Sequence, residues 1–226
     1  MIIGERKPLE EIAAMAAPYK KVCVLGCNTC VAVCMAGGQK EAEETATLLR
    51  MHRNKENVEG EVDVFSLERQ CEFEFIDEEL ERLKGYDVIV SLACGVGVQT
   101  MVEHVSSLRV VPGLNTTSMG YPTQQGVWAE RCLGCGDCVL DFTMGICPIT
   151  RCAKSILNGP CGGSAEGKCE ISKDVDCAWH LIHERLSAFG RVGDMAEIKP
   201  PKDWSSSHHG GPRTTVREDV KIDSGE

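Results

Sequence analysis

Cysteine content is the feature of this sequence that most restricts how the chain can fold. The chain has 226 residues and 14 of them are cysteine. Its first residues lack the basic segment and apolar segment of a secretory signal peptide. We therefore expect a cytoplasmic protein, in which disulfides do not persist. Clustered thiols in that compartment usually hold metal or carry redox chemistry.

Charge and hydropathy exclude two classes of partner. The formal net charge is −10 and the isoelectric point is about 5.2. An acidic surface repels a phosphate backbone, so we expect no nucleic-acid partner. No stretch approaches the roughly 18 consecutive apolar residues of a membrane helix. We therefore expect no membrane insertion.

Strand and helix patterns alternate through the first half of the chain. This alternation predicts an α/β fold with a parallel sheet and right-handed crossovers. We expect a small Rossmann/flavodoxin-like sheet with its four strands in the order 2-1-3-4. The predicted strands are 19–26, 61–66, 86–92 and 108–112, and the predicted helices are 31–53, 77–83 and 98–105.

A first group of thiols belongs to this α/β half. Cys27 and Cys30 follow the first predicted strand, Cys34 follows them, and Cys94 follows the third strand. The carboxyl ends of strands one and three meet at the switch point of such a sheet. These four thiols can surround one [4Fe–4S] cluster. Cys71, which follows the second strand, is a possible substitute ligand.

Other readings of this first group remain open. The pair Cys27 and Cys30 alone also fits a redox dithiol or half of a zinc site. A thiol oxidoreductase is therefore a competing function. Cys23 lies inside the first predicted strand and is interpreted as a buried apolar residue rather than a ligand.

A second group of thiols is more specific. Cys132, Cys135 and Cys138 are separated by two residues each, and Cys147-Pro148 follows. Bacterial ferredoxins use this spacing to hold an iron–sulfur cluster. Tetrahedral zinc sites usually pair one closely spaced couple with a distant couple.

A third group completes two sets of four in the second half. Its members are Cys152, Cys161, Cys169 and Cys177. By analogy with the interleaved ligands of two-cluster ferredoxins, we predict one cluster on Cys132, Cys135, Cys138 and Cys177. The other would be held by Cys147, Cys152, Cys161 and Cys169. One cluster plus one zinc ion is the alternative for these eight thiols.

The predicted domain boundaries follow a change in composition, because from about residue 126 cysteine and glycine become frequent and strand patterns end. We predict an α/β domain at residues 1–125 and a loop-rich, ferredoxin-like metal domain at 126–190. A helix is expected at 176–189. Residues 191–226 are predicted to form an extended tail, and from Lys199 the tail has no hydrophobic period. It is interpreted as disordered or as wrapping over a partner.

Several longer motifs resemble a known family. They are 131–138 (RCLGCGDC), 143–148 (TMGICP), 158–163 (NGPCGG), 167–170 (GKCE) and 177–179 (CAW), together with 26–30 (GCNTC). The second half resembles the cysteine-rich C-terminal-type domain of methylenetetrahydrofolate reductase. The whole arrangement, over about residues 19–190, resembles the MetV-type small iron–sulfur subunit of that enzyme.

The resemblance implies a function and partners. The partner would be a large subunit with a TIM barrel, which carries the flavin and reduces 5,10-methylenetetrahydrofolate to 5-methyltetrahydrofolate. This chain would relay electrons between an external donor protein and that flavin, without turnover alone. Its cofactors would be three [4Fe–4S] clusters, or at least two with zinc in place of one. A zinc-stapled structural subunit without electron transfer is the alternative.

Overall fold

The structure is a computed structural model that describes residues 1–208, 211–212, 214–217 and 219–221. Its internal contacts divide the chain into two compact units, Met1–Ala129 and Glu130–Glu226. Within the described residues, the search for membrane spans finds no helix with the length and apolar character needed to cross a bilayer. The domain boundaries at 125 and 190 stay predictions.

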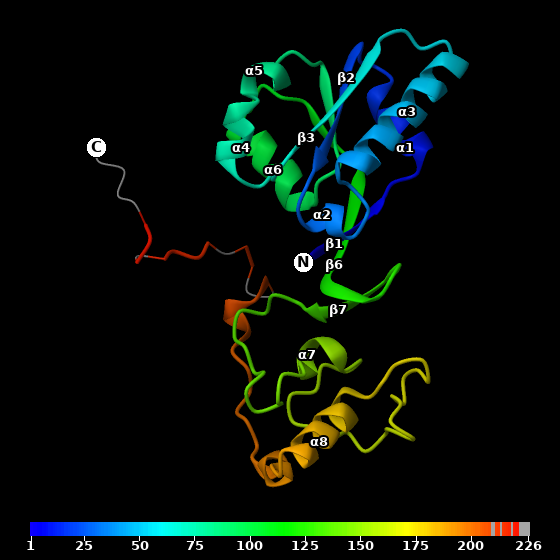
Figure 1. The fold of residues 1–226 in the computed structure, drawn as a ribbon. Helices are drawn as coiled ribbons and strands as arrows, with labels where there is room; N and C mark the ends of the chain where they lie inside the picture. Colours follow the sequence, from blue (N-terminus) through cyan, green and yellow to red (C-terminus); the bar gives the residue numbers. More distant parts are fainter. Residues whose placement is uncertain (209–210, 213, 218, 222–226) are drawn as a thin grey trace. The chain divides into compact units, whose positions relative to one another are not determined.

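A four-stranded parallel sheet forms the centre of the first unit (Figure 1). Runs rich in Val, Ile and Leu are typical of strands that are buried on both faces. The sheet order is β3-β2-β4-β5, which confirms the predicted order 2-1-3-4 and the α/β class. The strands are β2 (Lys21–Cys27), β3 (Glu61–Leu67), β4 (Val88–Ser91) and β5 (Val110–Pro112).

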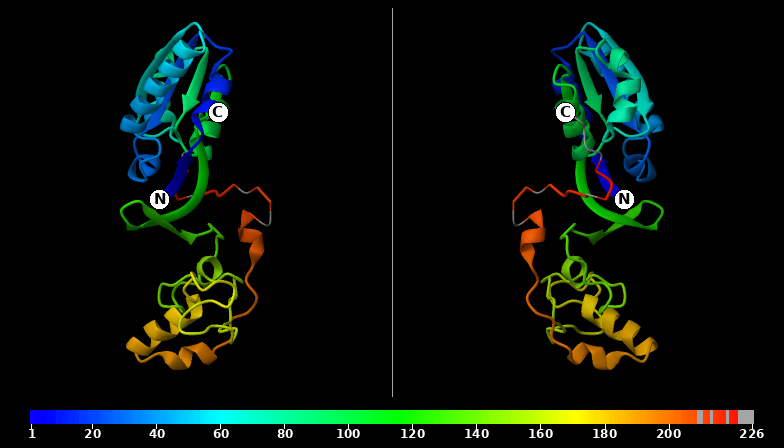
Figure 2. Two further views of the ribbon diagram at one scale, coloured as in Figure 1. Left: turned by 90° about the vertical axis from the view of Figure 1, so that its right-hand side faces the viewer. Right: turned by 90° about the vertical axis from the view of Figure 1, so that its left-hand side faces the viewer.

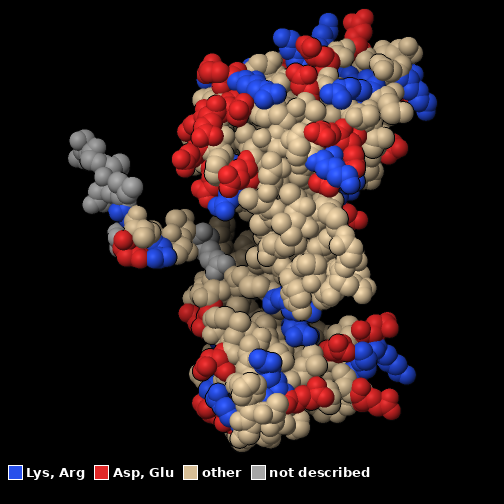
Figure 3. Space-filling view, in the orientation of Figure 1, with Lys and Arg blue, Asp and Glu red and all other residues tan. Residues whose placement is uncertain are grey.

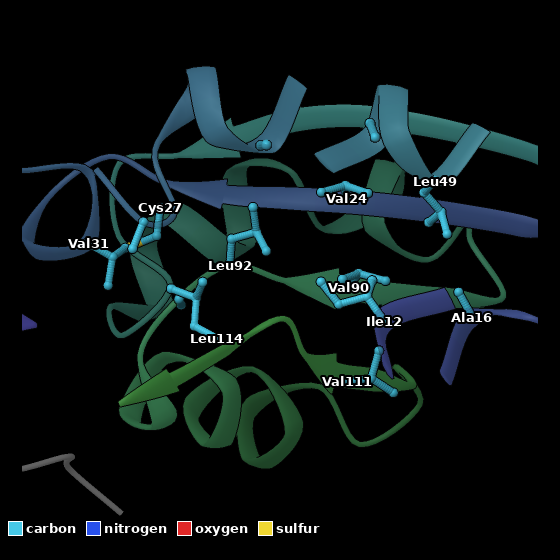
Figure 4. Packing of buried hydrophobic residues seen from close by; sticks show 14 of the residues in the cluster. Ile12, Ala16, Val24, Cys27, Val31, Leu49, Val90, Leu92, Val111 and Leu114 are labelled. Carbon is cyan, nitrogen blue, oxygen red and sulfur yellow. The ribbon is translucent and has the colours of Figure 1, made fainter. Parts of the chain in front are cut away.

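Helices cover both faces of this sheet (Figure 1). One core contains Ile12, Val24 and Leu49 (Figure 4), and Cys27 lies at the end of this core beside Val31 and Leu92. A second core fills the opposite face. The first face carries α1 (Leu9–Ala16) and α3 (Gln39–Lys55), and the second carries α4 (Phe73–Glu78), α5 (Leu80–Leu83) and α6 (Gly95–His104).

The prediction of one helix over residues 31–53 is wrong. The chain forms a short α2 (Cys30–Val33) and starts again at Gln39. Between them Met35 has a φ of 55°, and Gly37 packs so closely that an added methyl group would overlap the carbonyl oxygen of Leu92. This turn also accepts a hydrogen bond from Cys27 N to Gly37 O at 2.8 Å. The break therefore fixes the loop that carries the first cysteines.

A three-stranded antiparallel sheet was not expected from the sequence. Its order is β1-β6-β7. Ile2 pairs with Met119 and Arg6 pairs with Leu114, and the paired strands run side by side in both views of Figure 2. The strands are β1 (Ile2–Arg6), β6 (Leu114–Gln124) and β7 (Val127–Cys132).

Loops dominate the second unit, as the sequence predicts. Its hydrophobic core is small and centres on Trp179, Ile182 and Leu186. The predicted helix over 176–189 is confirmed by α8. The elements are α7 (Pro148–Arg151), α8 (Ala178–Ala188) and the 3-10 turns η1 (Val192–Ala196) and η2 (Trp204–Ser206).

Residues 199–207 contact the cysteine-rich unit itself, and the role of the tail toward a partner stays a prediction. Asn158 exchanges two hydrogen bonds of 2.9 Å with the backbone of Lys199. Ser206 Oγ donates to Cys135 O at 3.2 Å. This segment therefore packs on its own cysteine-rich unit.

Gly37 offers a direct test of the turn between α2 and α3. Replacing Gly37 with Ala should lower the free energy of unfolding by roughly 1–3 kcal/mol, because the new methyl group meets backbone rather than a movable side chain. Denaturant unfolding of the complete protein measures the change. Gly95→Ala is the matched control, since its nearest atom would be Thr116 Oγ1 at 3.6 Å. Equal unfolding midpoints for the two variants would contradict this role of Gly37.

Candidate functional site

Three thiols converge at the carboxyl edge of the parallel sheet. Cys27 ends β2, Cys71 follows β3 and Cys94 follows β4. The pKa of the Cys71 thiol is raised, first by partial desolvation and then by the neighbouring thiols of Cys27 and Cys94. These three sulfurs therefore lie close enough for their thiolates to repel one another. A metal cation relieves such repulsion and favours the thiolate forms.

A buried glutamine fixes this edge. Gln70 is fully buried, and its Nε2 donates to the carbonyl oxygens of Leu25 and Gly26 at 3.0 and 2.9 Å. Ser91 Oγ donates to Gln70 Oε1 at 2.6 Å. The side chain thus ties the loop that carries Cys71 to the ends of β2 and β4. The sequence analysis missed this residue because nothing in the sequence marks a buried glutamine.

Cys30 and Cys34 differ in their surroundings. Cys30 is half-buried at the first position of α2. Cys34 is 5% exposed, and its Sγ accepts a hydrogen bond from Gly4 N at 3.5 Å and donates to Val31 O at 3.5 Å. The thiol of Cys34 is thus held by backbone groups of β1 and α2. Cys71, rather than Cys34, joins the electrostatic group of Cys27 and Cys94.

Acidic side chains gather over α4 and α5 beside this edge (Figure 3). Such a surface attracts a partner of the opposite charge and speeds its association. The acidic residues of this segment are Glu72, Glu74, Asp77, Glu78, Glu79 and Glu81.

The second group of thiols lies on a tight loop, residues 132–138, which we call the cysteine loop. Gly134 and Gly136 occupy the gaps between its cysteines with φ values of 61° and 83°. This left-handed conformation suits glycine. It lets Gly134 N donate to Cys132 Sγ at 3.3 Å. Amide donors to sulfur are a recurring way of stabilising metal-bound thiolates.

The third group of thiols shares a pocket. Cys152, Cys161, Cys169 and Cys177 all line it, so we call it the four-cysteine pocket. Gly163 N donates to Cys161 Sγ at 3.5 Å, which repeats the amide-to-sulfur contact of the cysteine loop. The structure therefore groups Cys177 with Cys152, Cys161 and Cys169, whereas the ferredoxin analogy groups it with Cys132.

Backbone pairing and α8 build this pocket. An antiparallel bridge joins Lys168 and Asp176. On either side of it, Cys169 N donates to Val175 O at 2.9 Å and Cys177 N donates to Gly167 O at 2.8 Å, so the two cysteines flank this bridge. Cys177 is also the N-cap residue of α8, and the free amide groups of a helix start favour negative charge. Trp179 Nε1 donates to Ile156 O at 2.9 Å and so anchors α8 to the neighbouring loop.

Cys147 stands apart from the four-cysteine pocket. It is the N-cap residue of α7, and its Sγ lies 3.6 Å from Thr150 Oγ1. Its half-buried thiol is the remaining candidate ligand of the second unit.

The chemistry of the donor sets is that of candidate metal ligands. Among the described residues, no three His, Cys, Asp or Glu side chains are arranged to hold one ion as they stand. Loading therefore requires thiol side chains to turn inward. Thiolates select zinc or iron–sulfur clusters, and amide groups already point at Cys132 and Cys161.

Comparison with known proteins gives one match. Residues 111–205 match the sequence model of a family described as methylene-tetrahydrofolate reductase C terminal. Neither the search of curated proteins nor the search of solved structures returned a match. The match covers all eight thiols of the second unit and extends beyond Lys199.

Cys23 provides a test of the thiol environments. It is fully buried in β2, and burial raises the pKa of its thiol to about 12, against the opposing effect of Arg82. Below that pH the thiolate is scarce, so native Cys23 should resist iodoacetamide at pH 7 and still resist it at pH 9. Peptide mass spectrometry measures the labelling, and protein unfolded in guanidinium is the control. Rapid labelling of Cys23 in native protein would contradict its assigned burial.

Proposed function

We propose, from the match of residues 111–205 to the methylene-tetrahydrofolate reductase C-terminal family model, that the chain is the electron-transfer subunit of a methylenetetrahydrofolate reductase complex. It relays electrons between an external donor protein and the flavin of a catalytic large subunit. That large subunit reduces 5,10-methylenetetrahydrofolate to 5-methyltetrahydrofolate. In this proposal the flavin and the catalytic residues belong to the large subunit.

The cysteine loop is the observation that carries this proposal. Its three thiols at two-residue gaps, with glycine in each gap and an amide donor to Cys132 Sγ, suit three corners of a [4Fe–4S] cluster. Such a cluster exchanges one electron at a time and performs no folate chemistry itself. A redox role for the chain and a folate role for its partner follow from this division.

We assign the thiols to three sites. The edge site consists of Cys27, Cys30, Cys71 and Cys94 and would hold one [4Fe–4S] cluster. The cysteine loop with Cys147 would hold a second. The four-cysteine pocket, Cys152, Cys161, Cys169 and Cys177, would hold one zinc ion, since four thiolates around one pocket suit a tetrahedral ion. This assignment replaces Cys34 with Cys71 and exchanges Cys147 with Cys177 relative to the sequence prediction.

The residues around the edge site have positioning roles. Gln70 holds the Cys71 loop against the ends of β2 and β4. The acidic surface of α4 and α5 begins directly after Cys71 in the sequence. It suits a partner with a basic surface around its own redox centre. Electrons would therefore enter or leave where the sheet edge is both thiol-rich and acidic.

A structural role for zinc alone is the second candidate function. The observation in its favour is the small core of the second unit, which among its described residues centres on Trp179, Ile182 and Leu186. A structural metal ion would add to the stability of a unit with such a small core. In that case the protein would scaffold the enzyme without transferring electrons.

Metal content separates these two functions. Protein purified without oxygen should contain about eight iron, about eight acid-labile sulfide and about one zinc per chain, because two thiol sets hold clusters and the third holds a tetrahedral ion. Elemental analysis and sulfide assay measure these amounts. About twelve iron without zinc would place a third cluster in the four-cysteine pocket. Near-zero iron with bound zinc would overturn the electron-transfer proposal.

The edge site is tested by a matched pair of variants. Cys71→Ser should reduce iron by about four per chain, since one thiolate ligand of a cluster is lost. Cys34→Ser should leave iron unchanged, because backbone groups rather than metal hold this sulfur. Iron analysis of both variants beside the unaltered protein gives the result. Loss of iron from the Cys34 variant alone would restore the ligand set predicted from the sequence.

A further inference from the structure

A buried lysine lies against the cysteine loop. The side chain of Lys202 is 1% exposed, and its Nζ lies 3.1 Å from Asp137 Oδ2. The same Nζ donates to the carbonyl oxygen of Asp137. Asp137 lies between Cys135 and Cys138, so the buried ammonium group is adjacent to two candidate ligands.

One carbonyl group links the lysine to a ligand sulfur. The Asp137 carbonyl oxygen that accepts from Lys202 Nζ also lies 3.7 Å from Cys135 Sγ. The ammonium and this sulfur therefore share a single acceptor atom. Charges at such short range interact strongly where solvent is excluded.

Lys202 lies in the segment 199–207, which we call the strap. It is fastened at Lys199 by the two hydrogen bonds with Asn158 and at Ser206 by the bond to Cys135 O. Between these points, Asp203 Oδ1 accepts from Ser205 N at 2.8 Å and closes the turn η2. The position of Lys202 is therefore fixed from both sides.

The burial of this ammonium requires compensation. Removing a charged group from water costs several kcal/mol unless opposite charge and hydrogen bonds replace the water. The carboxylate of Asp137 is one counter-charge, but its side chain is 55% exposed, and solvent screens its share. An anionic cluster held by the cysteine loop would supply a second counter-charge next to the Asp137 carbonyl group.

We propose that Lys202 is a positioning residue that sets the reduction potential of the cluster on the cysteine loop, with the strap as its support. This inference rests on the proposed function, because it requires a cluster at that loop. Each reduction adds one negative charge to a cluster, and a fixed cation nearby stabilises the reduced form more than the oxidised form. Net charge and solvent exposure are established determinants of cluster potential.

The test is a redox titration, followed by electron paramagnetic resonance, of the complete protein purified without oxygen. The signal of this cluster is the one that disappears in Cys135→Ser. Replacing Lys202 with Met keeps the length of the side chain and removes its charge. The equilibrium constant for reduction should fall about tenfold, which is 59 mV for a one-electron couple.

Two further variants separate charge from packing. Lys199→Met removes a cation from the same strap that pairs with Glu197 and retains 26% exposure, and it should leave the potential unchanged. Asp137→Asn removes the carboxylate and should shift the potential in the opposite direction to Lys202→Met. A purely structural role of the strap predicts no such opposite shifts.

The outcomes distinguish this inference from the proposed function. An unchanged potential in Lys202→Met, with iron retained, overturns the inference alone. If Lys202→Met loses iron, Asp137→Asn decides, and the absence of an upward shift overturns the inference. A complete absence of the cluster signal from the unaltered protein overturns the inference together with the proposed function.

Discussion

The order of the parallel sheet is the constraint on which the first candidate site depends. At the sheet edge, desolvation and then the nearby thiols of Cys27 and Cys94 raise the pKa of the Cys71 thiol, so these three sulfurs lie close together. Fold topology imposes this closeness, since parallel strands deliver their carboxyl ends to one edge. A bound cation converts the same arrangement from repulsive to favourable. The sheet order therefore explains why cysteines that are distant in sequence can serve one centre.

The second unit obtains its thiol geometry without a sheet. Glycines with left-handed conformations shape the cysteine loop, and a bridge between Lys168 and Asp176 sets the approach of Cys169 and Cys177. Amide groups donate to Cys132 and Cys161 in both places. In the second unit the local backbone conformation positions the thiols, whereas in the first unit the order of the strands positions them. The two units reach the same kind of donor set by different physical means.

The sequence predicts some of these features well and others not at all. Strand order was predictable, because buried apolar runs alternate with helical segments and the crossover rule leaves few topologies. The break before Gln39 was not, because the need for Gly37 comes from the carbonyl group of Leu92, which directly follows β4. Gln70 and Lys202 are polar residues whose burial arises only from tertiary contacts. The grouping of Cys177 with Cys152 likewise depends on a bridge that the spacing does not reveal.

Metal bound to the second unit would have a structural consequence as well as a redox one. The first unit has two extensive apolar cores. Among the described residues, the apolar cluster of the second unit is smaller and centres on Trp179, Ile182 and Leu186. Binding free energy at such thiols becomes folding free energy. A zinc ion in the four-cysteine pocket would therefore hold the frame on which the cysteine loop and Lys202 keep their relative positions.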